Sequence, residues 1–201
     1  MTITCYPYGP LASNMYLIDT HSGCFIVDPS VSLDRISNHI PESIDGILIT
    51  HGHFDHINAL DEWHGRFPEA GIYISPDDME MLGSADKNGS MVFSVRCSYN
   101  SKASDIYGLK LDNLKVLRTP GHSKGSVCLL FEEGEERELF TGDTLFAGSA
   151  GRTDLYGGSS RELIASLNSL KDLDPDTVVL PGHGPSSTVK EELRNNPFFN
   201  F

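Results

Sequence analysis

The chain has 201 residues and a formal net charge of −13 at pH 7, with 39% hydrophobic and 21% charged residues. This composition is typical of an ordinary globular protein, and the length predicts a single domain over residues 1–201. The acidic balance disfavours nucleic-acid partners, which require a basic surface, and no apolar run approaches transmembrane length, so no membrane partner is expected.

The chain start and the cysteines bear on the compartment. Residues 1–5 contain neither the basic region nor the apolar core of a signal peptide. The four cysteines form no Cys-x-x-Cys pair, and the simplest interpretation is that they are reduced thiols. We therefore expect a cytoplasmic protein.

The first part of the chain predicts strands with short connections. Residues 14–19 and 24–28 are apolar runs joined by a four-residue polar turn, a pattern typical of a strand hairpin. Residues 33–40 form a candidate helix with Ser32 as its cap. Residues 44–49 are a short apolar run that predicts a buried strand.

Helical spacing begins after His56 and continues to Pro68, which should end the helix. Asp55 is well placed to cap this helix. The apolar residues at helical spacing are Ile57, Leu60, Trp63 and Phe67. Residues 71–75 then predict a strand, and residues 76–82 predict a short helix.

Residues 83–108 give the weakest pattern, because they are rich in Ser, Asn and Lys. Two interpretations stay open: a functional lid over a site, or a poorly ordered insertion. Further strands are expected at residues 115–118, 127–131, 138–141 and 177–180, and a packed helix at residues 161–170. The tail carries Phe198, Phe199 and Phe201, which either dock on the domain or leave the tail loose.

Residues 50–56, with the sequence Thr-His-Gly-His-Phe-Asp-His, follow the predicted buried strand and so are expected on a loop. His51 and His53 are two residues apart, so in an extended chain their side chains point to the same side and can meet one metal ion. Gly52 between them would permit a tight turn.

Asp55 and His56 come next and can face a second ion beside the first. Imidazole nitrogens and carboxylate oxygens are the ligands of zinc, and they also suit iron or manganese. A chance occurrence of His-x-His-x-Asp-His in a chain of this composition is rare, about one in a thousand. The segment therefore predicts a metal site, with zinc as the expected ion.

Three further strand ends carry metal donors. Val-Leu-Arg-Thr-Pro-Gly-His ends at His122, and Val-Val-Leu-Pro-Gly-His ends at His183. Asp143 likewise follows the strand predicted at residues 138–141. Strand ends in one sheet system open on the same edge, so we expect these loops to converge on one site.

Taken together, these segments resemble the metallo-β-lactamase-fold hydrolases over nearly the whole chain. The resemblance implies an α/β fold, a four-layer αββα sandwich with the metal site at one edge of the sheets. By that match, one divalent metal ion would be held by His51, His53 and His122, and a second by Asp55, His56 and His183, with Asp143 bridging them.

Within that family, Thr-Gly-Asp-Thr-Leu-Phe at residues 141–146 and Ala-Gly-Arg-Thr-Asp-Leu at residues 150–155 look like the short, single-domain glyoxalase II-like branch. Asp143 stands where the commonest zinc β-lactamases carry cysteine, which argues against antibiotic hydrolysis. The helical C-terminal domain that supplies much of the glutathione site in full-length glyoxalase II enzymes has no counterpart here.

The resemblance implies a hydrolase of thioesters or esters, with a small-molecule substrate such as S-D-lactoylglutathione. A metal-bound hydroxide would attack the acyl carbon, and Asp55 would ligate and also orient the hydroxide or pass its proton. Each imidazole should donate its second N–H to a carboxylate or a carbonyl, and Asp19, Asp28 and Asp154 are available for this. Arg152 either meets a substrate carboxylate or forms a structural ion pair with an acid such as Asp154.

Two other functions compete with the thioester hydrolase. The persulfide dioxygenases share this fold and would use His51, His122 and Asp143 as a site for a single iron. A metal-stabilised binding protein is the third interpretation. It is disfavoured because structural zinc sites are closed and often use cysteine, whereas the seven donors here are all histidine or aspartate.

Overall fold

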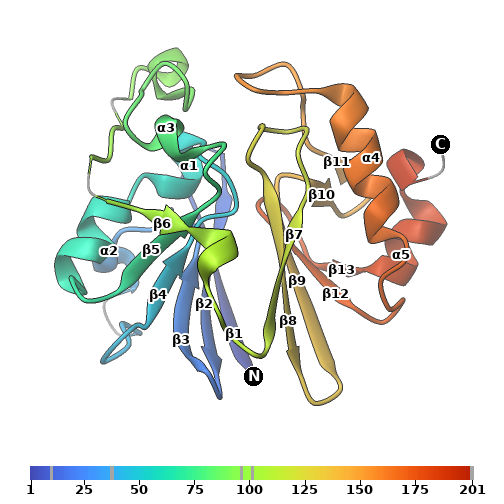
Figure 1. The fold of residues 1–201 in the computed structure, drawn as a ribbon, viewed down its shortest axis with the longest axis horizontal. Coiled ribbons are helices and arrows are strands. Elements are labelled where there is room, and N and C mark those ends of the chain that lie inside the picture. The colour runs from blue at the N-terminus through green and yellow to red at the C-terminus, as the bar shows by residue number, and fades with distance from the viewer. Residues whose placement is uncertain (10, 37–38, 96, 101, 200–201) are drawn as a thin grey trace.

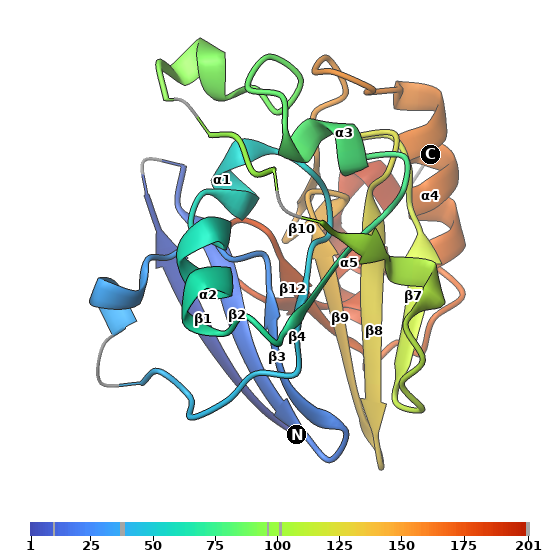
Figure 2. The same cartoon turned by 60° about the vertical axis from the view of Figure 1, so that its left-hand side comes forward.

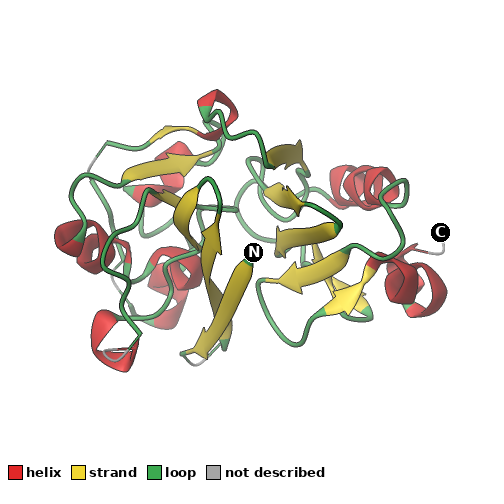
Figure 3. Cartoon of the chain, turned by 90° about the horizontal axis from the view of Figure 1, so that it is seen from below, coloured by secondary structure: helices red, strands yellow, loops and turns green. Residues whose placement is uncertain are grey.

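The computed structural model of the protein describes residues 1–9, 11–36, 39–95, 97–100 and 102–199. Two mixed sheets pack face to face, and helices cover the outer face of each (Figure 1). The view from below shows the same order of layers, with strands between two groups of helices (Figure 3). The expected αββα sandwich is therefore confirmed.

The first sheet has six strands in the order β1-β2-β3-β4-β5-β6. Strands β1, β2 and β3 pair antiparallel, whereas β3 to β6 run parallel. The strands are β1 (Thr2–Tyr8), β2 (Ser13–Thr20), β3 (Gly23–Val27), β4 (Gly46–Leu48), β5 (Gly71–Ile74) and β6 (Ser104–Asp105). Parallel pairing places the ends of β3, β4 and β5 on one edge of the sheet.

The second sheet has five strands in the order β13-β12-β9-β8-β7, and β10 pairs with β11 in a separate ribbon. The strands are β7 (Leu114–Arg118), β8 (Val127–Glu133), β9 (Glu136–Gly142), β10 (Leu145–Phe146), β11 (Ser149–Ala150), β12 (Val178–Pro181) and β13 (Ser187–Thr188). Strands β9 and β12 are parallel, so both end at the edge where β4 ends.

The α-helices α1, α2 and α3 lie outside the first sheet, and α4 and α5 lie outside the second (Figure 1). They are α1 (Phe54–Ile57), α2 (Leu60–Arg66), α3 (Met79–Leu82), α4 (Ser160–Leu170) and α5 (Val189–Asn195). Short 3-10 turns complete the described part of the chain: η1 (Leu33–Ile36), η2 (Ser90–Phe93), η3 (Ile106–Gly108) and η4 (Pro197–Phe199).

Central strands have both faces buried, which explains their continuous apolar runs. In β8, Val127, Leu129 and Phe131 point into the core between the sheets, whereas Cys128 and Leu130 point to the helices outside. The same alternation places Phe25 of β3 in the inter-sheet core. Aromatic rings join the two sheets there, with the ring centroids of Tyr16 and Phe140 separated by 5.1 Å.

Two predicted helices differ from the structure. The helix expected at residues 33–40 is only the 3-10 turn η1, and residues 37–38 lie outside the described part. The helix expected after His56 is divided into α1 and α2 by a turn at residues 58–59. Asp55 is not its cap, because it lies within the first turn of α1 and the N-cap residue is His53.

The C-terminal segment docks on the second sheet. Phe199 is buried with the residues of α4, and Phe198 is exposed; Phe201 lies outside the described residues. The strand β1, the ribbon β10–β11, strand β13 and helix α5 were not predicted. Within the described ranges, no helix has both the length and the apolar character needed to cross a membrane.

Candidate metal centre

The seven predicted donors converge at the edge where β4, β7, β9 and β12 end, which is the upper edge in Figure 1. Figure 2 shows α1 at the same edge as these strand ends. His51 and His53 follow β4, whereas Asp55 and His56 lie on α1, so part of the cluster is helical rather than on a loop. The remaining donors follow strands of the second sheet: His122 after β7, Asp143 after β9 and His183 after β12.

His51, His53 and His122 form one group that could hold an ion, with their donor nitrogens within 4.8 Å of one another. The Nδ1 of His53 lies 2.8 Å from Nε2 of His122. All three side chains are buried, and their rings are nearly perpendicular in pairs. Three ring nitrogens therefore face one point from two different sheets.

Asp55, His56 and His183 form a second such group. The Nε2 of His183 lies 3.3 Å from Oδ2 of Asp55 and 3.3 Å from Nε2 of His56. The Nε2 of His56 lies 3.6 Å from the same Asp55 oxygen. Like the first group, this one joins residues of α1 to a residue that follows a strand of the second sheet.

Asp143 lies between the two groups. Its Oδ1 is 3.3 Å from Nε2 of His56, and its Oδ2 is 3.4 Å from Nε2 of His122 and 3.5 Å from Nε2 of His183. One carboxylate thus reaches donors of both groups, which is the geometry that a bridging ligand requires. The assignment of these side chains as ligands stays a prediction.

Outer partners orient the imidazoles. Nδ1 of His56 is 2.9 Å from Oδ2 of Asp28, Nδ1 of His122 is 2.8 Å from the Arg152 carbonyl, and Nδ1 of His183 is 2.8 Å from the Leu11 carbonyl. These contacts are the donated second N–H bonds that the sequence led us to expect. They leave Nε2 of each ring directed into the cluster.

Asp28 also lies near His51 and His56 in a possible third set of donors. Its carboxylate accepts hydrogen bonds from the Thr50 amide and the Thr50 hydroxyl, each at 2.7 Å, besides the contact with His56. Asp28 is buried and has a left-handed backbone conformation, with φ of 53°. Because its oxygens already have partners, we interpret it as a support for His56 rather than a ligand.

The donor set fits bound cations on its own chemistry. The Nε2 atoms of His51 and His53 are buried and make no hydrogen bond within the described part of the chain. Buried polar atoms without partners are costly, so such atoms in a native site commonly indicate an ion or water. Neutral imidazole and carboxylate together are suitable ligands for zinc, iron or manganese.

Protonation of the two groups differs. Burial lowers the pKa of His51 well below its usual value, and burial with the neighbouring His122 lowers the pKa of His53 to about 3, so both rings are neutral and able to ligate. Burial also opposes the charge on His183, but Asp143 and Asp55 outweigh it and raise its pKa to about 9. Cations entering the second group would therefore displace protons.

The carboxylate of the second group, Asp55, and the shared carboxylate of Asp143 are both ionised. Burial opposes the charge on Asp55, but His56 and His183 overcome it and lower the pKa of Asp55 to about 2. The same balance of burial against His56 and His183 holds the pKa of Asp143 well below its usual value. Two negative side chains therefore face the second group at neutral pH.

Asp78 is a support that the sequence analysis missed. It is buried, and its carboxylate accepts hydrogen bonds from the Gly52 amide at 3.0 Å, the Ser123 hydroxyl at 2.6 Å and the Gly125 amide at 2.7 Å. Gly52 lies between two donors of the first group, and Ser123 follows His122. One carboxylate thus fixes two donor loops, although only its place after a strand was visible in the sequence.

Gly52 has a different role from the one expected. Its φ is not in the left-handed region, so the backbone does not need glycine for a tight turn there. Instead, a Cβ atom at this position would lie 2.6 Å from Cβ of Met81. The residue must be small because α3 packs directly against the loop.

A cavity of about 330 Å³ opens onto the donors, and its wall includes His53, Asp55, His122, Asp143 and His183. Arg152 also lines it, but Nε and Nη2 of its guanidinium each donate a hydrogen bond of 2.7 Å to the carboxylate of Asp154. The structure thus contains the ion pair that was one of two interpretations of Arg152. A contact of Arg152 with substrate stays a prediction.

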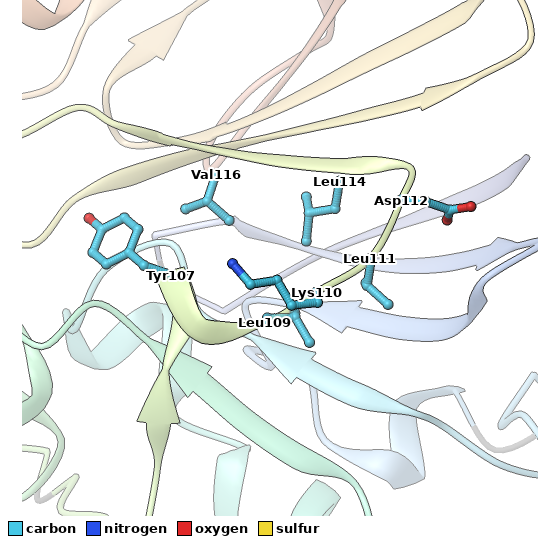
Figure 4. Close-up of a pocket in the computed structure, with 7 residues that line it drawn as sticks. All are labelled: Tyr107, Leu109, Lys110, Leu111, Asp112, Leu114 and Val116. Carbon is cyan, nitrogen blue, oxygen red and sulfur yellow. The ribbon is translucent and has the colours of Figure 1, made fainter.

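A second hollow, of about 560 Å³, lies beside the connection from η3 to β7 (Figure 4). Its wall is mainly apolar, with Leu109, Leu111, Leu114 and Val116, and none of the predicted metal donors lines it. Asp112 points away from the side chains of this wall in Figure 4. The predicted metal donors therefore line the cavity of about 330 Å³ and not this hollow.

Comparisons with known proteins identify the family to which the chain belongs. The sequence profile described as "Metallo-beta-lactamase superfamily" matches residues 8–183. The probable metallo-hydrolase YqgX of Bacillus subtilis (strain 168) is 36% identical over 204 residues, which cover 96% of this chain and 95% of that protein. Hydroxyacylglutathione hydrolase GloC of Haemophilus influenzae is 31% identical over 217 residues, which cover 100% of this chain and 99% of GloC.

Solved structures are also similar over nearly the whole chain. The BLEG-1 B3 metallo-beta-lactamase gives a TM-score of 0.88 at 31% identity, covering 100% of both chains. TTHA1623 in a di-iron-bound form gives a TM-score of 0.86 at 34% identity, covering 97% of this chain and 99% of that one. With its fold, its His and Asp metal-binding groups and these relatives, the chain belongs to the metallo-beta-lactamase superfamily and is a metallo-hydrolase.

Proposed function

We propose that this protein is a binuclear metal-dependent hydrolase of thioesters such as S-D-lactoylglutathione. The observation that carries the proposal is the pair of donor groups that share Asp143 at the base of one cavity. GloC, a hydroxyacylglutathione hydrolase related over the whole chain, supports the thioester as substrate class. TTHA1623, with two irons, supports two ions in a fold of this kind.

The reaction consumes one water. A C–O bond forms at the acyl carbon, the C–S bond breaks, and the products are a carboxylate, a thiol and one proton. Divalent ions bound by the two groups would supply hydroxide near neutral pH and polarise the acyl carbonyl. The residues of the chain must hold the thioester beside the metal donors in the cavity and accept the proton that the reaction releases.

Asp55 is the proposed proton acceptor. It lines the cavity, and the Ser13 hydroxyl donates a hydrogen bond of 2.8 Å to its Oδ2, which fixes the carboxylate. Its low pKa keeps it ionised at neutral pH, so it can accept a hydrogen bond from water at the site. His51 and His53 are neutral and so carry no extra proton that they could release in this step.

The competing dioxygenase function needs a single iron and only three of the seven donors. The second group, Asp55, His56 and His183, is gathered as closely as the first and would hold a second ion. These donors alone do not separate the two functions, because the dioxygenases resemble this chain in retaining such histidines. The curated relatives YqgX, a probable metallo-hydrolase, and GloC, a hydroxyacylglutathione hydrolase, favour the hydrolase.

The test combines elemental analysis with activity assays. Protein expressed without added metal should contain about two metal ions per chain, and the metal-loaded protein should hydrolyse S-D-lactoylglutathione. His53→Ala should lose metal and reduce kcat/KM by at least about a hundredfold, because a ligand is removed. His21→Ala is the matched control, since His21 is exposed and lies in the β2–β3 turn, where its partners are Glu133 and Asp112.

Three results would contradict the proposal. The first is near-normal turnover by His53→Ala. The second is one iron per chain with oxygen uptake on glutathione persulfide and no hydrolysis, which would favour the dioxygenase. The third is cleavage of a β-lactam in preference to every thioester tested, which matters because a B3 metallo-beta-lactamase is among the similar structures.

A further inference from the structure

The cavity that the metal donors line also has a largely apolar wall. Its residues other than the donors include Leu11, Phe54, Val92, Phe93 and Leu155. Val92 is 79% exposed and Phe93 47%, and neighbouring Met91 and Val95 are exposed as well. Clustered exposed apolar side chains commonly mark a binding surface.

This wall is fixed to the metal centre. The ring centroids of Phe93 and Phe54 are 5.0 Å apart, and the Phe54 amide donates a hydrogen bond of 3.0 Å to the Asn88 carbonyl. Phe54 begins α1, the helix that carries Asp55 and His56. The turn η2 is therefore held against the donor helix, and its side chains form part of the site. This favours the lid interpretation of residues 83–108 over an unordered insertion.

The polar side chains of the wall are already engaged. The Asn88 side-chain amide donates to the carbonyls of Met81 and Cys97, and its oxygen accepts from the Ser90 amide. Arg152 is held by Asp154 in a bidentate pair. Apart from the predicted metal donors, every side-chain amide and every cation among the described lining residues therefore already has a protein partner.

The cation beside the lining residue Asn88 in the sequence is neutralised in the same way. Lys87, which precedes Asn88, pairs with Glu80, and Tyr156 donates a hydrogen bond of 2.5 Å to the same carboxylate. The Lys87–Glu80 pair has no net charge, and the whole chain carries −13, so an anionic substrate gains little attraction outside the metals.

We propose that the natural substrates are thioesters whose acyl chain is apolar and uncharged, with the chain lying against Leu11, Phe54, Val92, Phe93 and Leu155. This inference rests on the proposed thioester hydrolysis and specifies its substrate class. Recognition uses burial of methylene groups rather than ion pairs to a carboxylate. The thiol portion extends toward the open mouth and contributes little to selectivity.

The experiment compares two matched series of substrates on the metal-loaded protein. Acetyl, butanoyl and hexanoyl thioesters are prepared on N-acetylcysteamine, which is neutral, and on glutathione, which is anionic. If each buried methylene contributes its usual transfer free energy, kcat/KM should rise about fourfold per methylene. Hexanoyl has four more methylenes than acetyl, so its kcat/KM should be higher by up to about 250-fold if all four are fully buried, and by at least about tenfold if they are half-buried, in both series. Glutathione should give no advantage.

Two valines provide a matched pair of variants. Val92 lines the cavity, whereas Val95 does not, and both are exposed residues whose replacement leaves the core intact. Val92→Asp should lower kcat/KM for the hexanoyl ester at least about tenfold more than it lowers kcat/KM for the acetyl ester. Val95→Asp should leave both esters unchanged.

The outcomes separate this inference from the proposed function. Thioester hydrolysis without a chain-length effect, or with a clear preference for glutathione, would overturn the inference and leave the proposed function standing. Equal losses in Val92→Asp and Val95→Asp would also overturn it, because the effect would not belong to this wall. Hydrolysis of no thioester by protein that contains two metal ions would overturn the proposed function and this inference together.

Discussion

Replacing Asp78 with alanine should weaken both the fold and the metal centre. The substitution removes the acceptor of the Gly52 and Gly125 amides, which are buried in the two loops that carry the first donor group. Each buried N–H without a partner costs about 1–3 kcal/mol, so the expected loss is about 4 kcal/mol. For a protein of this size, that corresponds to a Tm lower by about 10 °C.

The metal should respond as well, because Asp78 fixes the backbone between His51 and His53. Loss of such an outer partner typically weakens metal binding by about tenfold to a hundredfold. Thermal unfolding followed by circular dichroism measures the first effect, and competition with a chromophoric chelator measures the second. Asp78→Asn keeps the shape and one acceptor oxygen, so it should fall between the wild type and Asp78→Ala.

The adjacent Asp77 supplies the control. Its carboxylate pairs with Arg118 and Lys124 at the surface, each at 2.9 Å, and exposed pairs of this kind contribute about 1 kcal/mol or less. Asp77→Ala should therefore change Tm by no more than a few degrees and leave metal affinity unchanged. If Asp78→Ala behaved like Asp77→Ala in both measurements, the assigned role of Asp78 would be wrong.

Other consequences can be measured independently. Burial and the neighbouring Glu136 raise the pKa of Glu138 from 4.5 to about 6, so the folded protein loses stability as pH rises through that interval. Glu138→Gln should remove this loss, which is about 1 kcal/mol after solvent screening. Denaturant titrations at pH 4.5 and 7 measure the free energy of unfolding, and an equal change between the two pH values in both proteins would contradict the prediction. Phe199 is buried whereas Phe198 is 41% exposed, so Phe199→Ala should cost about 3 kcal/mol and Phe198→Ala under about 0.5 kcal/mol in the same titrations. His183→Ala should lower the metal content from about two ions to one per chain by elemental analysis, and retention of both ions would exclude His183 as a ligand.

The donor cluster was predictable because its signals are local. The spacing of His51 to His56 is visible within seven residues, and the two Pro-Gly-His segments each follow an apolar run. Parallel strands then bring those ends together, as β9 and β12 do in the structure. The first and last of these donors are far apart in sequence. Their meeting could still be predicted, because each follows a strand that ends at the same edge.

The supports of the cluster were harder to predict because their partners are distant. Asp78 meets Gly125 across 47 residues, and Asp28 meets Thr50 across 22 residues. Aspartate after a strand is common, so nothing local separates Asp28 from Asp19. Such roles depend on tertiary contacts that sequence spacing does not encode.

The missed and altered elements have local explanations. The edge strand β1 contains Pro7 and mostly exposed residues, so it lacks the apolar signal of a buried strand, and proline is tolerated at such an edge. Helix α5 did carry a readable signal, because Thr188 and Glu191 form a capping box. The helix predicted after His56 divides because the chain turns at residues 58–59, although Leu60 and Trp63 are buried as its spacing required.

Each donor group takes residues from both halves of the sandwich. In the first group, His53 meets His122 across 69 residues, and in the second, His56 meets His183 across 127 residues. A bound ion would therefore act as a removable cross-link between the two sheets and would close long loops of the chain, as a disulfide does. Metal supply would then set the thermal stability of the protein, since binding to the folded state alone stabilises it by an amount that grows with free ion concentration. The same two ions would serve the reaction and hold the two sheets together. Loss of the bound metal would therefore both remove activity and expose the core between the sheets.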